Sequence, residues 1–314
     1  MRRDNDRLEP GGGERDKEDS CLGDDGPAGV GAGGEDAEGG EPALGGEAEA
    51  LAEELLGGEG EGEEDASEGD GSAGGEKPAK KVEEEEPPGP DVPAPSLKVL
   101  RTAMAWAFDG EDVEDSLLDA YAEHARLLLD YNRKVNLTAI LDPKEVAAKH
   151  YLDSWRLSQY MSLLGRRVLD LGSGGGFPGL PLALAEPNAS VCLVESSSKK
   201  AAFLQGCVSA LGIKNCSVYD GRCEELLVTE RCDIVLARAV SSVRENVRTL
   251  RKVRHSLKEY VMLKGASWSR EVRAGEREAE RLGFHLNTVF EHELPGEMGK
   301  RGILVYRAPG GHGL

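Results

Sequence analysis

The sequence predicts an α/β fold, a mostly parallel β-sheet with helices on both faces. Three observations predict it. From about residue 165, short apolar runs typical of buried strands alternate with segments of helical spacing. A glycine-rich turn, Gly172–Gly176, follows the first run, and charged side chains stand at the ends of several runs. Ligands bind at the carboxyl ends of parallel strands, so this pattern also indicates where a site should lie.

Helices are expected before the sheet begins. Leucine and tyrosine residues recur near helical spacing over Asp115–Tyr131, which predicts a helix packed beside the sheet. A turn is expected at Asn136–Thr138. Pro143 then suits a helix start, and the helix is expected to run through His150 and over Tyr151–Leu164.

Strands and helices alternate from Arg167 onward. The expected strands are Arg167–Leu171, Ser190–Val194, Cys216–Tyr219, Asp233–Ala237, Tyr260–Leu263, and two near His285–Glu291 and Gly302–Arg307. The expected intervening helices are Pro178–Ala185, Ser198–Leu211, Val243–Ser256 and Trp268–Leu282. Parallel strands require such crossover helices, so the alternation itself predicts the sheet.

Composition divides the chain into two parts. Residues 1–95 carry 30 acidic and 8 basic residues, 22 of the 41 glycines and no aromatic residue. Such a segment buries too little apolar surface to fold, so we expect a disordered acidic tail that ends in a Pro-rich linker. Residues 96–314 carry 28 acidic and 30 basic residues and form the expected folded domain, with helices over 96–164 and the sheet over 165–310. The net charge of −20 therefore describes the tail and does not argue against nucleic-acid binding.

Several classes of protein do not fit this sequence. No apolar run is long enough to cross a membrane, and the N-terminus resembles neither a signal peptide nor a transit peptide. The six cysteines form no C-x-x-C pair, so we expect free thiols, no metal site and a cytoplasmic location.

The run Asp170–Gly176 reads D-x-G-x-G-x-G, with glycines at 172, 174 and 176. Glycines let a backbone turn sharply and approach a ligand closely, and this loop is typical of S-adenosylmethionine (SAM) binding in class I methyltransferases. The dinucleotide fingerprint G-x-G-x-x-G fails because its last position is Phe177. Glu195 ends the next strand, where an acid is expected to bind ribose hydroxyls.

Three more polar positions follow strands. Cys223 and Glu224 come after the third strand, where they would contact adenine; the alternative is a plain helix start with acids in its first turn. Arg238 follows the fourth strand, and its guanidinium could bind a phosphate through two hydrogen bonds or stack on a base. The alternative is that Arg238 forms a structural salt bridge. Lys264 ends the fifth strand, with a solvated lysine as the alternative.

Two further patterns remain ambiguous. His150 and Asp153 share a helix face at three-residue spacing and suggest a catalytic pair, part of a metal site or, preferably, a buried structural hydrogen bond. Basic residues gather over Val243–Tyr260, which fits phosphate contact and a solvated helix face equally well.

Together these motifs resemble the RsmG/GidB family, bacterial methyltransferases that act on N7 of a guanine in small-subunit ribosomal RNA. The resemblance covers about Asp115 to Arg307. The matching segments are NRKVNLT at 132–138, HYLDS at 150–154, DLGSGGGFPGLP at 170–181, ARAV at 237–240 and LKG at 263–265. The late segment Gly299–Gly302 lacks the family's histidine, and the acidic tail has no counterpart.

The resemblance implies roles for individual residues. SAM would be the cofactor, and small-subunit ribosomal RNA, free or in an assembling particle, would be the partner of a monomeric enzyme. Arg238 and Lys264 would border the entry of the guanine, and no metal would take part. The residues implied in cofactor binding are Asp170, Gly172, Gly174, Phe177, Glu195, Cys223, Glu224 and Arg238.

Guanine N7 has an exposed lone pair and needs no deprotonation, so positioning and electrostatic fit would suffice. The absence of a paired-carboxylate or Ser/His/Asp pattern agrees with such chemistry. Two alternatives stay open at this point. One is a SAM enzyme acting on a small molecule or protein, and the other is a non-catalytic RNA-binding assembly factor.

Overall fold

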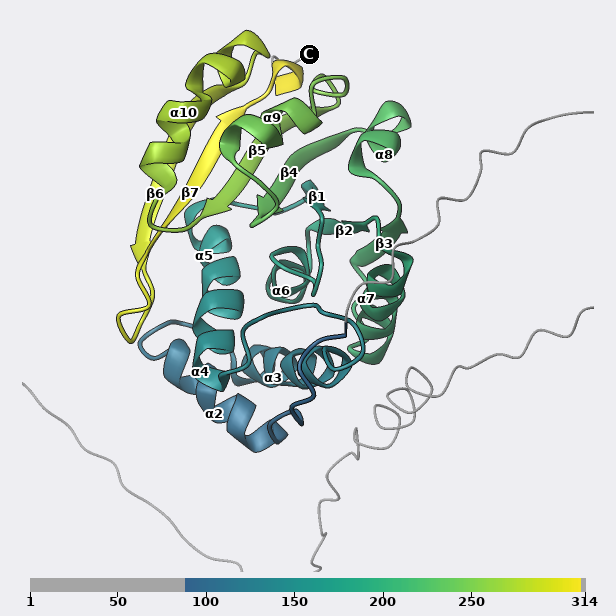
Figure 1. Ribbon diagram of the computed structural model, residues 1–314, viewed down its shortest axis with the longest axis vertical. Coiled ribbons are helices and arrows are strands. Elements are labelled where there is room, and N and C mark those ends of the chain that lie inside the picture. The colour runs from purple at the N-terminus through teal and green to yellow at the C-terminus, as the bar shows by residue number, and fades with distance from the viewer. Residues whose placement is uncertain (1–87, 312–314) are drawn as a thin grey trace, which may run out of the picture. The chain divides into compact units, whose positions relative to one another are not determined.

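A seven-stranded sheet forms the centre of the fold, in the order β3-β2-β1-β4-β5-β7-β6. The computed structural model describes residues 88–311, all within one of the two compact units of the chain, Leu44–Leu314. Strands β1 to β5 pair in parallel, whereas β7 runs antiparallel to both β5 and β6 (Figure 1). The strands are β1 Arg167–Leu171, β2 Ser190–Glu195, β3 Cys216–Asp220, β4 Cys232–Arg238, β5 Leu257–Lys264, β6 His285–Glu293 and β7 Lys300–Arg307.

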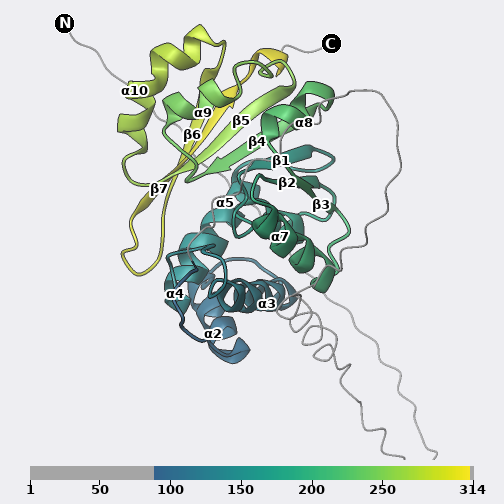
Figure 2. The same ribbon diagram turned by 45° about the vertical axis from the view of Figure 1, so that its right-hand side comes forward.

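The helices cover both faces of the sheet, as the alternation predicts (Figures 1 and 2). The first layer holds α2 Leu97–Ala107, α3 Asp115–Tyr131, α4 Pro143–Val146, a π-helical segment Ala147–Leu152, α5 Asp153–Tyr160, α6 Gly179–Ala185 and α7 Ser198–Ala210. The second layer holds α8 Cys223–Thr229, α9 Val243–Thr249 and α10 Trp268–Arg281, and a 3-10 turn, Pro309–Gly311, ends the described chain.

Side-chain alternation along the strands produces two hydrophobic cores. In β5, Val261 and Leu263 enter the core beneath the first helix layer, whereas Tyr260 and Met262 enter the core beneath the second. Successive residues of a strand point to opposite faces, so a strand covered on both faces is apolar at most positions. This explains the unbroken apolar runs in the sequence.

The predicted elements are found, with a few differences. No bounds were predicted for α2, and α8 was expected only as an alternative helix start. The expected helix over 143–164 ends at Tyr160 and contains the π-helical segment. The expected helix Val243–Ser256 stops at Thr249, because i to i+3 hydrogen bonds then wind the chain in tighter turns that keep Leu250 and Val253 in the second core.

The predicted acidic tail falls almost wholly outside the described residues. Its last part, residues 88–95, forms no helix or strand, and Asp91 there makes an ion pair of 2.7 Å with Arg133. Within the described range no helix is long and apolar enough to cross a membrane. The five cysteines of that range are free thiols.

Candidate functional site

The glycine loop lies at the carboxyl end of β1 and folds over the end of β2. Gly172 and Gly174 adopt φ values of 67° and 55°, the left-handed region that side chains disfavour. The N–H groups of Gly172 and Ser173 both donate to the carbonyl of Val194, at 2.9 and 3.1 Å. A Cβ added at Gly174 would meet no protein atom within 4 Å, so the loop backbone faces open space there.

Glu195 holds this loop in place. Its Oε2 accepts the N–H of Gly174 at 2.9 Å, and its Oε1 accepts those of Ser196 and Ser197 at 2.9 and 3.0 Å. Its backbone carbonyl accepts the N–H of Gly221 beyond β3, at 2.9 Å. One residue thereby joins the ends of three neighbouring strands, and lone pairs remain on its carboxylate for a ligand hydroxyl.

Asp170 lies beneath the loop and not at its surface. The side chain is fully buried, and Oδ2 accepts the N–H of Gly179, at the start of α6, at 3.0 Å. Burial raises the pKa of this carboxyl from 3.8 to about 6, although the Gly179 N–H opposes the shift. Oδ1 has no hydrogen-bond partner among the described residues, so one buried acceptor remains available.

Cys223 and Glu224 begin α8, so the helix-start interpretation is correct as local structure. The Cys223 side chain is 3% exposed in the second core, and burial raises the pKa of its thiol. A ligand at this edge would therefore meet the Cys223 backbone and the half-buried Glu224 carboxylate. Both residues follow β3, which pairs with the end of β2 where Glu195 lies.

Arg238 ends β4 and is held by acceptors from the π-helical segment. Its Nη1 donates to the carbonyl of Lys149 at 2.9 Å, and its Nη2 lies 3.2 Å from Nδ1 of His150. The guanidinium carbon lies 4.8 Å from the centroid of the buried Phe177 ring. Phe177 directly follows the glycine loop, so Arg238 packs against the end of that loop.

The predicted His150–Asp153 hydrogen bond is wrong. His150 contacts Arg238 and Thr138, whereas Asp153 accepts from Nε2 of His292 at 3.0 Å and lies 4.0 Å from Nε of Arg301. The i, i+3 rule assumes α-helical geometry. Here the intervening turn is π-helical, and its wider winding changes which side chains share a face.

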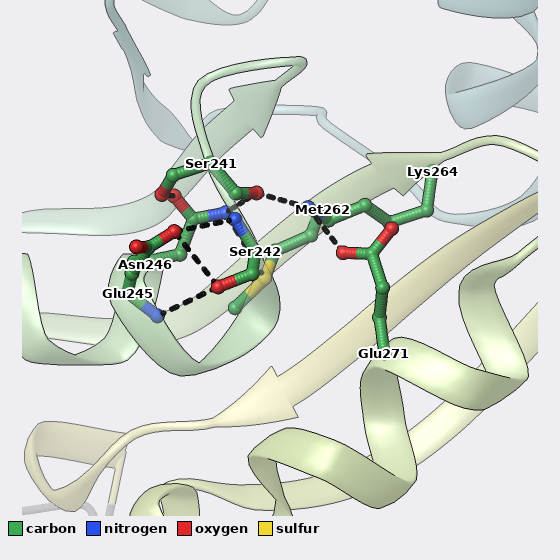
Figure 3. Close-up of polar contacts among 7 residues, drawn as sticks. All are labelled: Ser241, Ser242, Glu245, Asn246, Met262, Lys264 and Glu271. Carbon is green, nitrogen blue, oxygen red and sulfur yellow. Dashed lines mark hydrogen bonds and ion pairs between the residues drawn. The ribbon is translucent and has the colours of Figure 1, made fainter.

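Lys264 ends β5 and is 7% exposed, so the solvated-lysine alternative is wrong. Its Nζ donates to the carbonyl of Ser241 and forms an ion pair of 3.0 Å with Glu271 of α10 (Figure 3). Beside this contact, Ser242 and Glu245 form a capping box that starts α9. Lys264 thus ties the β4–α9 connection and α10 to the end of β5.

Arg238 and Lys264 line the same cavity of 560 Å³ at the ends of β4 and β5. Ala239, which follows Arg238 and also lines the cavity, has a φ of 54°, which is rare for a residue with a Cβ and places a strained turn at the cavity wall. The lining residues are Ile140, Lys149, His150, Asp153, Arg238, Ala239, Ser241, Ser242, Leu263, Lys264, Gly265, Glu271 and Arg301.

The structure therefore divides the predicted residues into two groups. Asp170, Gly172, Gly174, Glu195, Cys223 and Glu224 lie at the ends of β1 to β3, whereas Arg238 and Lys264 lie at the cavity, with Phe177 in contact with Arg238. Sequence reasoning missed Lys149 and Arg301 as lining residues. Arg301 stands inside Gly299–Gly302, the segment that lacks the family's histidine.

The strand order with antiparallel β7, together with the glycine loop and Glu195, defines the class of protein. It is the fold of class I SAM-dependent methyltransferases, in which the cofactor lies across the ends of β1 to β3. The residues present fit that cofactor, because the loop backbone faces open space at Gly174 and the Glu195 carboxylate beside it keeps acceptor capacity.

Comparison with known proteins identifies the family. The family model described as GidB, rRNA small subunit methyltransferase G, matches residues 117–296, so this chain belongs to that family. Ribosomal RNA small subunit methyltransferase G of Carboxydothermus hydrogenoformans is 33% identical over 202 residues, 63% of this chain and 86% of that protein. Its namesake from Solibacter usitatus is 36% identical over 196 residues, 62% of this chain and 91% of that protein. Among solved structures, a methyltransferase from Pyrococcus furiosus matches with a TM-score of 0.46 and 11% identity, over 67% of this chain and 95% of that one.

The buried Asp170 predicts a specific pH dependence of stability. Because its folded pKa of about 6 lies above the ordinary 3.8, its contribution is fully present below pH ~4 and is lost as the pH rises through about 6. Asn at this position keeps an acceptor for Gly179 and does not ionise. Urea unfolding of both proteins should show the wild type losing about 2 kcal/mol relative to Asp170→Asn between pH 4 and 7. A difference that stays constant with pH would contradict this assignment.

Proposed function

We propose that this chain transfers the methyl group of SAM to N7 of a guanine in small-subunit ribosomal RNA. Family membership supports the substrate class, and the adjacency of a cofactor loop and a cationic cavity supports the reaction. Phe177 and Arg238 carry the proposal, because their contact joins the two parts of the site. We also propose that the enzyme works as a monomer in the cytoplasm.

SAM, when bound, supplies an electrophilic methyl group. Gly172 and Gly174 would hold it by backbone contact, Glu195 would accept from its ribose, Cys223 and Glu224 would meet its adenine, and Asp170 would support the loop from below. Arg238 and Lys264 would bound the space for the guanine. These residues orient the reactants and exclude water, which is the main requirement when the nucleophile already has a lone pair.

The acids and the histidine that line the cavity all have partners. Both ring nitrogens of His150 are hydrogen-bonded, Asp153 contacts His292, and Glu271 contacts Lys264. A general base must be within reach of the proton it removes and free to accept it. A cavity whose acids and histidine are already hydrogen-bonded or ion-paired suits a substrate nitrogen that needs no deprotonation.

Cofactor binding is tested by Gly174→Val with Gly212→Val as its matched control. Both glycines have φ near +60° and open space around a new Cβ, but Gly212 follows α7, away from the glycine loop. Both variants should lose similar stability, about 1–2 kcal/mol, because the backbone strain is the same. Calorimetry should show SAM affinity reduced at least about tenfold in Gly174→Val alone. Equal SAM affinity in the two variants would refute the loop assignment.

Methyl transfer is tested on small-subunit RNA and particles that lack the modification, with mass spectrometry of the nucleosides. We expect 7-methylguanosine at one position. Arg238→Ala and Lys264→Ala should lower turnover by roughly 10²-fold, since each removes a cation from the cavity. Arg166→Ala, which breaks an ion pair with Glu259 beside the start of β1, is the control and should keep near-normal turnover.

Activity that falls only in step with melting temperature would make Arg238 and Lys264 structural residues. Methylation of a small molecule or protein in place of RNA would support the alternative of a SAM enzyme with a different substrate class. RNA binding without SAM binding would support a non-catalytic assembly factor.

We further propose that residues 1–95 are dispensable for chemistry and weaken non-specific RNA binding. They carry a net charge of −22 beside a remainder of +2 and can compete with phosphates for basic residues such as Arg248–Lys258. A chain that starts at Ser96 should methylate at least as well and bind random RNA more tightly at low salt, with the difference fading above ~0.1 M. Loss of methylation on truncation would instead make the acidic segment a substrate-binding element.

A further inference from the structure

Three segments far apart in the sequence meet around the Arg238 guanidinium. They are the Asn132–Thr138 segment after α3, the π-helical segment Ala147–Leu152 and the glycine loop through Phe177. The first contains the NRKVNLT motif, and the second contains His150 of the HYLDS motif. Their contacts with each other form a continuous chain that ends at Arg238.

The π-helical winding provides the first contact. In an α-helix the N–H of Asp153 would bond to the carbonyl of Lys149, four residues back. Here that N–H bonds instead to the carbonyls of Ala148 and His150. The Lys149 carbonyl is therefore open to Nη1 of Arg238, which donates to it at 2.9 Å. Single π-helical turns of this kind often occur at functional sites.

His150 provides the second contact, and its partners determine its tautomer. Arginine only donates, so Nδ1 of His150, 3.2 Å from Nη2 of Arg238, must be the unprotonated acceptor. The ring proton is then on Nε2, which donates to Oγ1 of Thr138 at 2.9 Å. Burial, and next the charge of Arg238, lower the pKa of His150 well below its usual range, so the ring stays neutral.

Thr138 is itself fixed by a buried asparagine. Oδ1 of Asn132 accepts the N–H groups of Leu137 and Thr138 at 2.7 and 2.9 Å, and its Nδ2 donates to the Thr138 carbonyl at 3.0 Å. Asn132 is 1% exposed. Oγ1 of Thr138 also accepts from the N–H of Ile140, which lines the cavity, at 3.0 Å. The hydroxyl therefore has one defined position opposite the imidazole.

We propose that Thr138 and His150 are positioning residues that orient Arg238 at the cavity. Thr138 holds the His150 ring in place through Nε2, and the unprotonated Nδ1 accepts from the guanidinium and so fixes its direction. Phe177 stacks on His150 with ring centroids 4.6 Å apart and limits movement from the other side. The inference rests on the proposed function only in assuming that Arg238 serves methyl transfer. The arrangement of the His150 ring can be observed without measuring turnover.

The first experiment compares Thr138→Val with Thr138→Ser in the full-length protein. Val keeps the shape but loses the hydroxyl, whereas Ser keeps the hydroxyl. We expect Thr138→Val to lower kcat at least about tenfold with unchanged SAM affinity, and Thr138→Ser to stay within about twofold of wild type, since small misplacements reduce rates strongly. Equal kcat in all three proteins, or equal losses in both variants, would overturn the inference.

The second experiment compares His150→Asn with His150→Gln. The Asn amide oxygen can occupy the place of Nδ1 and accept from Arg238, whereas the Gln amide reaches the place of Nε2. Turnover should therefore be retained better in His150→Asn, by at least about fivefold. The reverse order would show that the contact with Arg238 is not the one that matters.

A readout independent of activity is the ¹⁵N spectrum of the histidine ring. The wild type should show protonated Nε2 and unprotonated Nδ1, and Thr138→Val should shift the Nε2 resonance, because that N–H loses its acceptor while Arg238 keeps Nδ1 unprotonated. Protonated Nδ1 in the wild type would overturn the inference. Failure of the wild type to methylate ribosomal RNA would instead overturn the proposed function, while this spectrum would still decide the arrangement of the ring.

Discussion

The Glu195 carboxylate is the interaction on which the cofactor part of the site depends. A buried carboxylate is costly unless its oxygens are hydrogen-bonded, and here three backbone N–H groups satisfy it. One of these belongs to Gly174, which can offer its N–H only because its backbone is left-handed. The same contact therefore stabilises the acid and shapes the loop, so neither residue can be altered without affecting the other.

The sheet positions the site by dividing the helices between two cores. Strands β4 and β5 contribute to both cores, and their last residues, Arg238 and Lys264, lie at the carboxyl edge of the sheet that separates the two helix layers. Arg238 is held from the first layer by the π-helical segment, and Lys264 from the second by α10. The cavity between them thus depends on packing on both faces of the sheet.

Much of this arrangement could be predicted from the sequence, because buried parallel strands are apolar at most positions and glycines mark the tight turn. The placement of Gly174, Glu195, Arg238 and Lys264 at strand ends followed from the same pattern, and the structure confirms that placement. Their proposed roles toward SAM and RNA stay predictions.

The contacts of His150 and Lys264 could not be predicted, for physical reasons. Helical periodicity assumes a constant register, and the π-helical turn breaks it at His150. Lys264 ends a strand, but its partners Ser241 and Glu271 come from two other segments of the chain. The packing of α9 against α10 brings those segments together, and no local sequence pattern encodes that packing. Long-range contacts of this type depend on the assembled fold.

The two parts of the site are mechanically connected through Phe177. Its ring stacks on His150 and lies under Arg238, while its backbone N–H belongs to the glycine loop and donates to the Ser173 carbonyl at 2.9 Å. Close-packed interiors transmit displacement and do not absorb it. A movement of the glycine loop would therefore shift the Phe177 ring against which Arg238 packs. The geometry of the cofactor loop and the geometry of the cavity thus depend on each other.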